Sequence, residues 1–373
     1  MSRKALLNLH RYLGLSLLGF LLVISLSGFA VVFEQEWDAL LNPGLYRVAQ
    51  PGAPALPPGE LAARIEAQLP RAHLTHLPLV REPRRAVVAY VAPRLDPRTG
   101  DAHALDFDEA FVDPTTGRVN GVRQWGECCA RANWLPLLYK VHNRLLMPSS
   151  IGHRVLAVIA LAWLALSLVG LYLVLSARRR QLTWQRGLRG RPATLQWHRL
   201  LGLWTLPVAL VTIVTGLSMV LEDEVTRPLV ELVGGDTLAT EHLTPVAHDA
   251  PLDHGRAYQL ALSALAQPAA TLVPAAVDYS PSRREYRVAF ADAALPGAAP
   301  RVVRVGDAGA GTMAVVEERR TVSGQLLANR QALHSGVLLG LPGRVVAAAM
   351  ALVLAAMSGT GLWMWRQRTI RRR

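Results

Sequence analysis

The chain has 373 residues, of which 51% are hydrophobic. With a mean hydropathy of +0.24, this composition excludes an ordinary soluble protein of this length and indicates an integral membrane protein. The formal net charge of +13 would suit a nucleic-acid-binding protein, but the basic residues gather beside apolar runs. We therefore interpret the charge as a signal of membrane topology and expect no nucleic acid as a partner.

Four apolar runs divide the chain, at residues 12–33, 155–176, 200–221 and 345–365, and none has a charged residue in its interior. Each has about 20 residues, the length of a helix that crosses ~30 Å of hydrocarbon. The sequence therefore predicts an α-helical protein with four transmembrane helices in a lipid bilayer. The first run is longer than the apolar core of a signal peptide and is repeated by the third, so we expect the mature chain to keep it.

Short arginine-rich segments lie beside the spans, at residues 178–199 and 366–373. Such segments mark the cytoplasmic side, so we expect both termini in the cytoplasm and the long segments in the periplasm of a bacterial inner membrane. The predicted divisions are the N-terminus with the first span (1–33), a periplasmic domain (34–150), the second span (151–176), a basic loop (177–199), the third span (200–221), a second periplasmic domain (222–340), and the fourth span with a basic tail (341–373).

The two halves of the chain repeat one plan. LHRYLGL at residues 9–15 returns as WHRLLGL at residues 197–203, and the same offset of 188 residues matches further positions. The matched pairs are His10 with His198, Arg11 with Arg199, Gly14 with Gly202, Gly28 with Gly216, Glu34 with Glu222 and Glu36 with Glu224. Allowing small gaps, His142 in LLYKVHNRLL also matches His334 in RQALHSGVLL. We therefore predict two parallel two-helix repeats, related by an axis along the membrane normal.

Each long segment has the pattern of a small α+β domain. A helical pattern at residues 57–70 follows a proline-rich linker at 50–59, and strand patterns follow in RRAVVAYVAP and DFDEAFVDPTTGRVNGVR. The second segment shows a helical pattern in GRAYQLALSALAQ, then strand patterns in EYRVAFAD, RVVRVGDAGAG and TMAVVEER. The sequence predicts two such domains.

Cys128 and Cys129 are the two cysteines of the chain. A disulfide between adjacent residues strains the peptide that joins them, so we expect inert or intermolecular thiols. A redox-active vicinal pair is the alternative.

Glycine and histidine share one face of the first predicted helix. Gly14 lies about one turn from His10, and Gly28 about five turns from it. His198, Gly202 and Gly216 repeat this face in the third helix. A flat macrocycle beside a helix needs both a nitrogen ligand and space near the backbone, and this pattern offers both.

His142 and His334 each precede an outgoing span, at the opposite membrane face. The hypothesis is two haem groups, with His10 and His198 as axial ligands of the inner iron, and His142 and His334 as axial ligands of the outer one. Two histidines fill both axial positions of an iron, which suits electron transfer.

Arg11 and Arg199, beside the inner ligands, could pair with haem propionates.

Several alternatives to haem binding stay open. Glycine often serves only for close helix packing, and a histidine at a helix end is often an interfacial residue. Zinc or copper is less favoured, because no Cys, Met or carboxylate near the pairs would complete a small-metal site. His153 could replace His142 as an outer ligand. We expect the other histidines on the surface: His73, His76, His103, His242, His248 and His254.

Four glutamates follow the outer ends of the first and third spans: Glu34, Glu36, Glu222 and Glu224. Acidic residues at a helix C-terminus oppose the helix dipole, so their symmetric placement invites a role in handling the substrate iron. The alternative is that they are solvated residues that end the spans.

The phrases LHRYLGL, WHRLLGL, LLYKVHNRLL and LHSGVLLGLPGR resemble those of the PepSY-associated transmembrane proteins, and FVDPTTGRVNGVR is similar to the end of a PepSY module. The layout resembles that of inner-membrane ferrisiderophore reductases of the FoxB type. This resemblance implies four spans, haem b held by His10, His142, His198 and His334, and reduction of a ferric siderophore in the periplasm. In the second module VGDAGAG replaces the DP-x-TG phrase, so that module departs from the pattern.

We therefore expect an electron conduit with two haem b groups that reduces Fe(III)-siderophore to release Fe(II). No G-x-G-x-x-G fingerprint is present, so the electrons would come from a quinol or a partner reductase. One alternative is an iron or siderophore transporter, although the spans lack buried charges. The other is a haem-free periplasmic binding or sensing protein anchored in the membrane.

Overall fold

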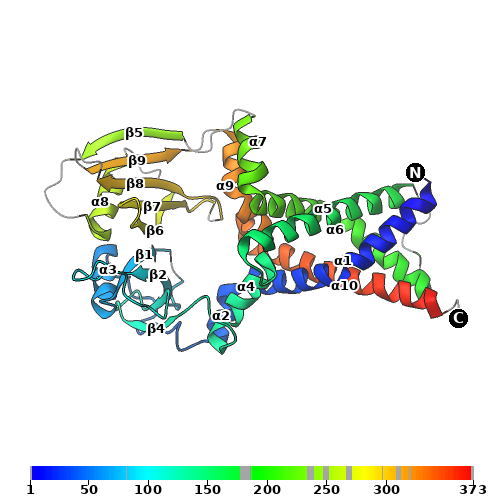
Figure 1. The fold of residues 1–373 in the computed structure, drawn as a ribbon, viewed down its shortest axis with the longest axis horizontal. Coiled ribbons are helices and arrows are strands. Elements are labelled where there is room, and N and C mark those ends of the chain that lie inside the picture. Colours follow the sequence, from blue (N-terminus) through cyan, green and yellow to red (C-terminus); the bar gives the residue numbers. More distant parts are fainter. Residues whose placement is uncertain are drawn as a thin grey trace. The chain divides into compact units, whose positions relative to one another are not determined.

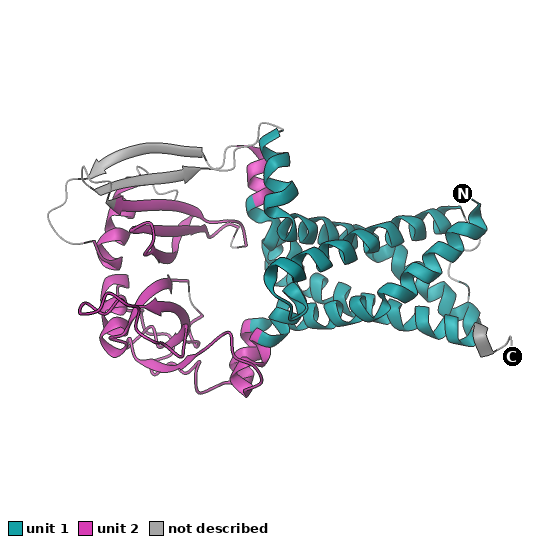
Figure 2. Cartoon of the chain, viewed as in Figure 1, with its two compact units in different colours: residues 1–34, 137–232, 328–373 teal, residues 35–136, 233–327 magenta. Residues whose placement is uncertain are grey.

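The computed structural model describes residues 2–80, 82–176, 185, 187–232, 239–246, 252–265, 271–295, 297–307, 312–318 and 321–370. The chain forms two compact units (Figure 2). The helical unit comprises Met1–Glu34, Leu137–Leu232 and Ala328–Arg373, and the sheet unit comprises Gln35–Pro136 and Val233–Leu327. The basic loop, the C-terminal tail and the VGDAGAG phrase of the sequence analysis lie partly outside the described residues.

Four long helices build the helical unit: α1 (Arg3–Val32), α5 (Ser149–Leu175), α6 (Arg191–Val220) and α10 (Gly340–Ile370). All four are long and apolar enough to cross a membrane, which confirms the prediction of a four-span membrane protein. Helix α1 packs on α5 and α10, and α6 packs on the same two helices. The N-terminus of α1 and the C-terminus of α10 lie at the same end of this bundle (Figure 1).

Short helices flank the spans at the other end of the bundle: α4 (Trp134–Arg144), η3 (Glu222–Thr226), α7 (Arg227–Leu232), α9 (Val322–Ser335) and η4 (Val337–Leu339). The chain reverses direction between α4 and α5 through Leu145 and Leu146, which adopt positive φ angles of 53° and 61°. Between α9 and α10 the same reversal uses Gly336, at φ 78°. These turns return the chain to the bundle directly after the histidine of each short helix.

The sheet unit contains one antiparallel sheet in the order β4-β3-β2-β1-β6-β7-β8-β9-β5. Its strands are β1 (Ala72–Pro78), β2 (Val87–Pro93), β3 (Glu109–Val112), β4 (Val119–Arg123), β5 (Ala239–Val246), β6 (Leu272–Ser280), β7 (Glu285–Asp292), β8 (Arg301–Asp307) and β9 (Thr312–Glu318). The segment before the basic loop supplies helix α3 (Pro58–Gln68) followed by four antiparallel strands, and the segment after it supplies β5, then helix α8 (His254–Ala264) and four further strands. They meet where β1 pairs with β6 (Figure 1). The two predicted α+β segments therefore share one sheet instead of forming separate domains.

Two apolar cores stabilise this sheet. Helix α3 packs Leu61 and Ile65 on β1, β2 and β3, and α8 packs Ala257 and Leu260 on β6, β7 and β8. The helices approach each other where Gly59 meets Gly255, and a Cβ atom added to Gly59 would lie 2.9 Å from the Cα atom of Gly255. Glycine at both positions is required by this close backbone approach.

The DPTTG phrase forms the turn between β3 and β4. Asp113 accepts hydrogen bonds from the backbone N–H of Thr115 and of Ala49, both at 2.8 Å, and Gly117 adopts a φ of 72°. Burial alone would raise the pKa of Asp113, but the hydrogen bonds from Thr115 and Ala49 outweigh it and hold this pKa below its ordinary value. The motif is therefore a structural turn that ties the linker after helix α2 (Glu34–Leu41) to the sheet.

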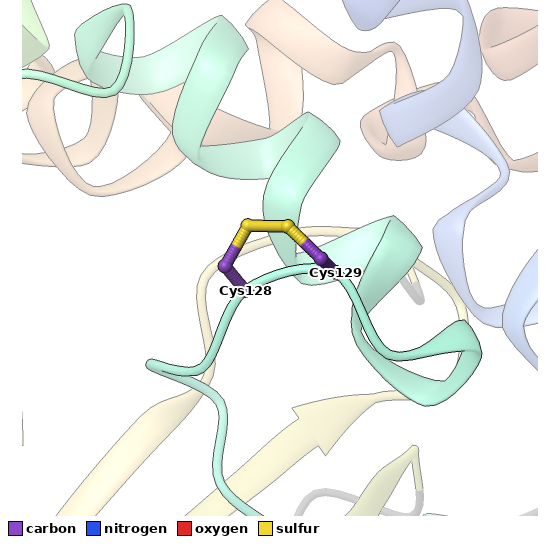
Figure 3. Close-up of a disulfide and its surroundings, with 2 residues drawn as sticks. All are labelled: Cys128 and Cys129. Atoms are coloured by element: carbon purple, nitrogen blue, oxygen red, sulfur yellow. A yellow bond between two sulfur atoms is a disulfide. The ribbon is translucent and has the colours of Figure 1, made fainter.

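Cys128 and Cys129 form a disulfide in the loop after β4 (Figure 3). The expectation of inert or intermolecular thiols is therefore wrong. Cys129 adopts a φ of 79°, and this left-handed backbone turns the chain so that the two side chains lie on the same side of it.

Arg123 is the centre of a buried ionic cluster in the sheet unit. Its guanidinium donates to Asp38 at 2.8 Å and to Glu109 at 2.5 Å, and all three side chains are less than 7% exposed. Tyr46 donates to the same Asp38 oxygen at 2.7 Å, and the guanidinium lies 4.8 Å from the centre of the Phe111 ring. Burial raises the pKa of Glu109, an effect that the Arg123 charge opposes. This cluster holds α2 against the sheet.

We predict that Arg123→Met destabilises the sheet unit by about 3–5 kcal/mol, because it leaves two buried carboxylates without a cation. Thermal unfolding of the detergent-solubilised chain, followed by circular dichroism, would measure the loss. As a control, Glu60→Gln removes the exposed ion pair with Arg64 and should cost about 0–1 kcal/mol. Equal losses in the two variants would contradict a structural role for the buried cluster.

Candidate functional site

The four histidines of the repeated phrases meet in two pairs inside the helical unit. His10 of α1 lies with its ring centre 6.3 Å from that of His198 of α6, and the two ring planes are 81° apart. His142 of α4 lies 6.2 Å from His334 of α9, with the planes 57° apart. All four rings are half-buried. The pairing that the sequence analysis proposed is therefore the pairing in the structure.

Each histidine directs its Nδ1 atom to a polar atom on a neighbouring helix. The contacts are His10 to the Leu166 carbonyl at 3.2 Å, His142 to the Ile24 carbonyl at 3.0 Å, His334 to the Thr212 carbonyl at 3.0 Å, and His198 to the Thr360 hydroxyl at 3.0 Å. A carbonyl only accepts, so Nδ1 donates in the first three. Since the Thr360 hydroxyl itself donates to the Met357 carbonyl, it accepts from His198.

This bonding fixes the chemical form of the rings. In a neutral imidazole whose Nδ1 carries the proton, Nε2 keeps a lone pair and serves as a metal ligand. Ligand histidines in proteins commonly donate their other N–H to a backbone carbonyl, which sets the orientation of the ring. His10, His142 and His334 have this arrangement, and His198 bonds to a hydroxyl in place of a carbonyl.

The distance within each pair matches that of two imidazoles on one metal. An imidazole nitrogen lies about 2.0 Å from its metal, so two nitrogens on opposite sides of one atom are about 4 Å apart. Adding the distance from each nitrogen to its ring centre places the two centres about 6 Å apart. The observed 6.3 Å and 6.2 Å agree with this value. The residues present therefore fit a group that takes two axial histidines, such as a haem.

The glycines of the predicted haem-binding face lie against side chains of neighbouring helices. A Cβ atom added to Gly28 would lie 2.8 Å from Cε1 of His142, and one added to Gly216 would lie 3.2 Å from Cε1 of His334. These two glycines leave space for the imidazole rings of His142 and His334. Gly14 faces Leu166, and Gly202 faces the methyl group of Met357. Helix packing explains both.

The contacts of the outer pair repeat with the same offset as the sequence. His142 contacts Ile24, Ser27 and Gly28, and His334 contacts the residues 188 positions further along α6. Those residues are Thr212, Thr215 and Gly216. The sequence analysis did not identify the carbonyls or hydroxyls that orient the rings, because a backbone acceptor has no residue signature.

The two arginines next to the inner histidines remain predicted propionate partners. Arg11 donates to Asn8, one turn earlier in α1, at 3.4 Å. Arg199 is half-buried in α6.

The glutamates at the ends of α1 and α6 do not gather into an iron site. Glu222 forms ion pairs with Arg330 of α9 and with Arg227, so its carboxylate is already engaged. Glu224 is exposed, and Glu34 and Glu36 are half-buried. Within the described ranges, no group of three or more His, Cys, Asp or Glu side chains could hold a metal ion. The role of these residues in handling iron thus gains no support from their placement.

The remaining histidines lie elsewhere. His153 lies in α5, and it is His142 that forms the outer pair with His334. In the sheet unit, His76 bonds to Asp278 across the β1–β6 contact. His254 is only 5% exposed, which corrects its expected surface position. His73 and His103 are half-buried. The side chain of His242 and all of His248 lie outside the described residues.

Four transmembrane helices with a strand-rich unit define a multi-pass membrane protein. Residues 7–368 match the model of the PepSY-associated TM region, so the chain belongs to that family. No curated protein matches the chain.

We predict that Gly28→Ala destabilises the helical unit by about 1–3 kcal/mol, because the added methyl group overlaps the His142 ring. Gly19→Ala, in the same helix, is the matched control, since nothing lies within 4 Å of its added Cβ atom. It should leave stability unchanged or raise it slightly. The comparison requires thermal unfolding of the two variants in the same detergent, and equal midpoints would contradict the contact.

Proposed function

We propose that this protein is a membrane-bound electron conduit that carries two haem b groups and reduces ferric siderophore. The two histidine pairs, with their Nδ1 atoms bonded to neighbouring helices, are the observation that carries this proposal. When bound, haem would supply reversible one-electron transfer.

The chain's own residues would prepare each site before the cofactor arrives. Backbone carbonyls of α1, α5 and α6 hold three of the rings, and the Thr360 hydroxyl of α10 holds the fourth. His10 and His198 would hold one haem and His142 and His334 the other, and a haem held by two histidines would supply electron transfer. Such a site suits electron transfer better than oxygen chemistry.

The two pairs lie at different levels of the bundle. Along α1, His10 is followed by Ile24, the residue that holds His142, and 14 residues of helix span about 21 Å. One pair would therefore serve each membrane surface. In the proposed topology both termini are cytoplasmic, the sheet unit is periplasmic, and the halves are parallel two-helix repeats, in agreement with the arginine-rich segments.

The proposed substrate follows from the FoxB-type resemblance of the sequence. Siderophores bind Fe(III) through hard oxygen donors, and these donors hold Fe(II) less tightly, so adding one electron to the iron releases it. The electron donor would be a quinol or a partner reductase at the cytoplasmic face. Iron would leave as Fe(II) at the periplasmic face.

The first test is the haem content of histidine variants. We expect the purified chain to show a Soret band with two haems per chain, because there are two histidine pairs. His10→Ala and His198→Ala should each deplete the same haem, and His142→Ala and His334→Ala the other. His103→Ala is the control and should keep both. Pyridine haemochrome spectra measure the content, and a chain expressed with sufficient haem that shows no Soret band would leave only a haem-free binding or sensing protein.

The second test addresses the substrate. Protein reduced with dithionite and then freed of it should be reoxidised by ferric siderophore, and a ferrous chelator should trap one Fe(II) per haem oxidised. His334→Ala, which we expect to lose the outer haem, should slow this step at least tenfold. Rapid reoxidation by oxygen alone, with no Fe(II) produced, would contradict the siderophore assignment while leaving the haem assignment intact.

A further inference from the structure

A cavity of about 490 Å³ lies within the sheet unit, between the part of the chain before the basic loop and the part after it. Its walls come from β1, from the N-terminus of α8, and from the hairpin of β6 and β7. The polar and aromatic residues that line it include His73, His254, Tyr279, Tyr286, Arg94 and Arg284. Its volume lies in the range of small-molecule sites, about 300–1,000 Å³.

His254 provides the main evidence for a ligand. The residue is only 5% exposed, and its Nε2 atom is buried with no hydrogen-bond partner among the residues that the structure describes. Burial lowers the pKa of His254 despite a hydrogen bond with the backbone of Leu74, which favours the neutral ring. Nε2 is then a buried acceptor that lacks a donor, which costs free energy unless a bound molecule supplies one.

The neighbouring side chains provide flat apolar surface. The rings of Tyr279 and Tyr286 lie 4.7 Å apart, His254 lies 5.1 Å from Tyr286, and His73 lies 5.9 Å from Tyr279. The Nε2 atom of His73 is also buried and has no partner within the described ranges. Such a group of rings can pack against an aromatic ligand by offset or edge-to-face stacking.

The charges at the cavity favour an anion. Glu66 is paired with Arg94 at 3.2 Å, so these two charges offset each other. Arg284, at the turn between β6 and β7, is exposed and forms no ion pair within the described part of the chain. The guanidinium of Arg284 is thus available to bind the carboxylate of a ligand.

We propose that this cavity binds a small aromatic organic anion that carries a hydroxyl or amino donor. The donor would bond to Nε2 of His254, the ring would pack on Tyr279 and Tyr286, and the anionic group would bond to Arg284. A metal ion is the weaker reading, because no third ligand completes a site with the two histidines within the described residues. The proposal does not depend on haem, since the cavity contains none of the paired histidines.

Calorimetric titration of the detergent-solubilised chain tests this, with three probes that differ by one group each. Para-hydroxybenzoate has all three features, benzoate lacks the hydroxyl donor, and para-hydroxybenzyl alcohol lacks the charge. We expect para-hydroxybenzoate to bind once per chain, and the other two to bind about tenfold more weakly.

Two variants assign the contacts. His254→Phe keeps the ring against Tyr286 and should reduce the affinity for para-hydroxybenzoate to that for benzoate, without changing the affinity for benzoate. Arg284→Gln, at an exposed position, should weaken both anions about tenfold and leave the alcohol unchanged. Arg284→Gln still tests the proposal if His254→Phe proves unstable. His76→Phe, on the same strand as His73 but outside the cavity, should bind as the parent does.

Three results would overturn the proposal. The first is no binding heat with any probe at millimolar concentration. The second is unchanged affinity in both Arg284→Gln and a folded His254→Phe. The third is binding of Zn²⁺ that depends on His254 while the aromatic anions do not bind.

Discussion

The hydrogen bond from Nδ1 of each paired histidine to a neighbouring helix is the constraint on which the helical unit depends. Inside an apolar bundle an imidazole N–H has few other acceptors, so a backbone carbonyl or a threonine hydroxyl that it reaches fixes both the ring and the register of two helices. Three different helix contacts, α1 with α5, α4 with α1 and α9 with α6, each contain such a bond. The same hydrogen bonds therefore set both the orientation of the rings and the packing of the helices, without a bound ligand.

The sequence predicted the spans and the histidine pairs well, because both depend on patterns that are visible in the sequence itself. Long apolar runs have few folded alternatives in a membrane protein, and the 188-residue offset made His10 and His142 visible through their counterparts. Strands β1 and β6 were missed, since the histidines, threonine and proline of β1 and the proline of β6 weaken the strand pattern. The roles of Gly28 and of the cysteines could not be predicted either, because each depends on which atoms approach it in space.

The sheet unit uses polar residues differently on its two sides. Around Arg123 both buried carboxylates bond to the guanidinium, and the cluster attaches α2 to the sheet. Around His254, by contrast, a buried ring nitrogen has no hydrogen-bond partner among the described residues. Structural clusters are complete in themselves, whereas a binding site is incomplete until its ligand arrives. This difference separates the two regions more clearly than burial does.

The pairing of β1 with β6 has a consequence for how the chain is made. His76 and Asp278, which face each other there, are separated by two spans and the basic loop. The ribosome delivers β1 long before β6, and in that interval one edge of the early strands has no partner. During synthesis this edge is open to pairing with other chains. A nascent protein of this architecture therefore needs either rapid membrane insertion or a chaperone that shields the first four strands until β6 emerges.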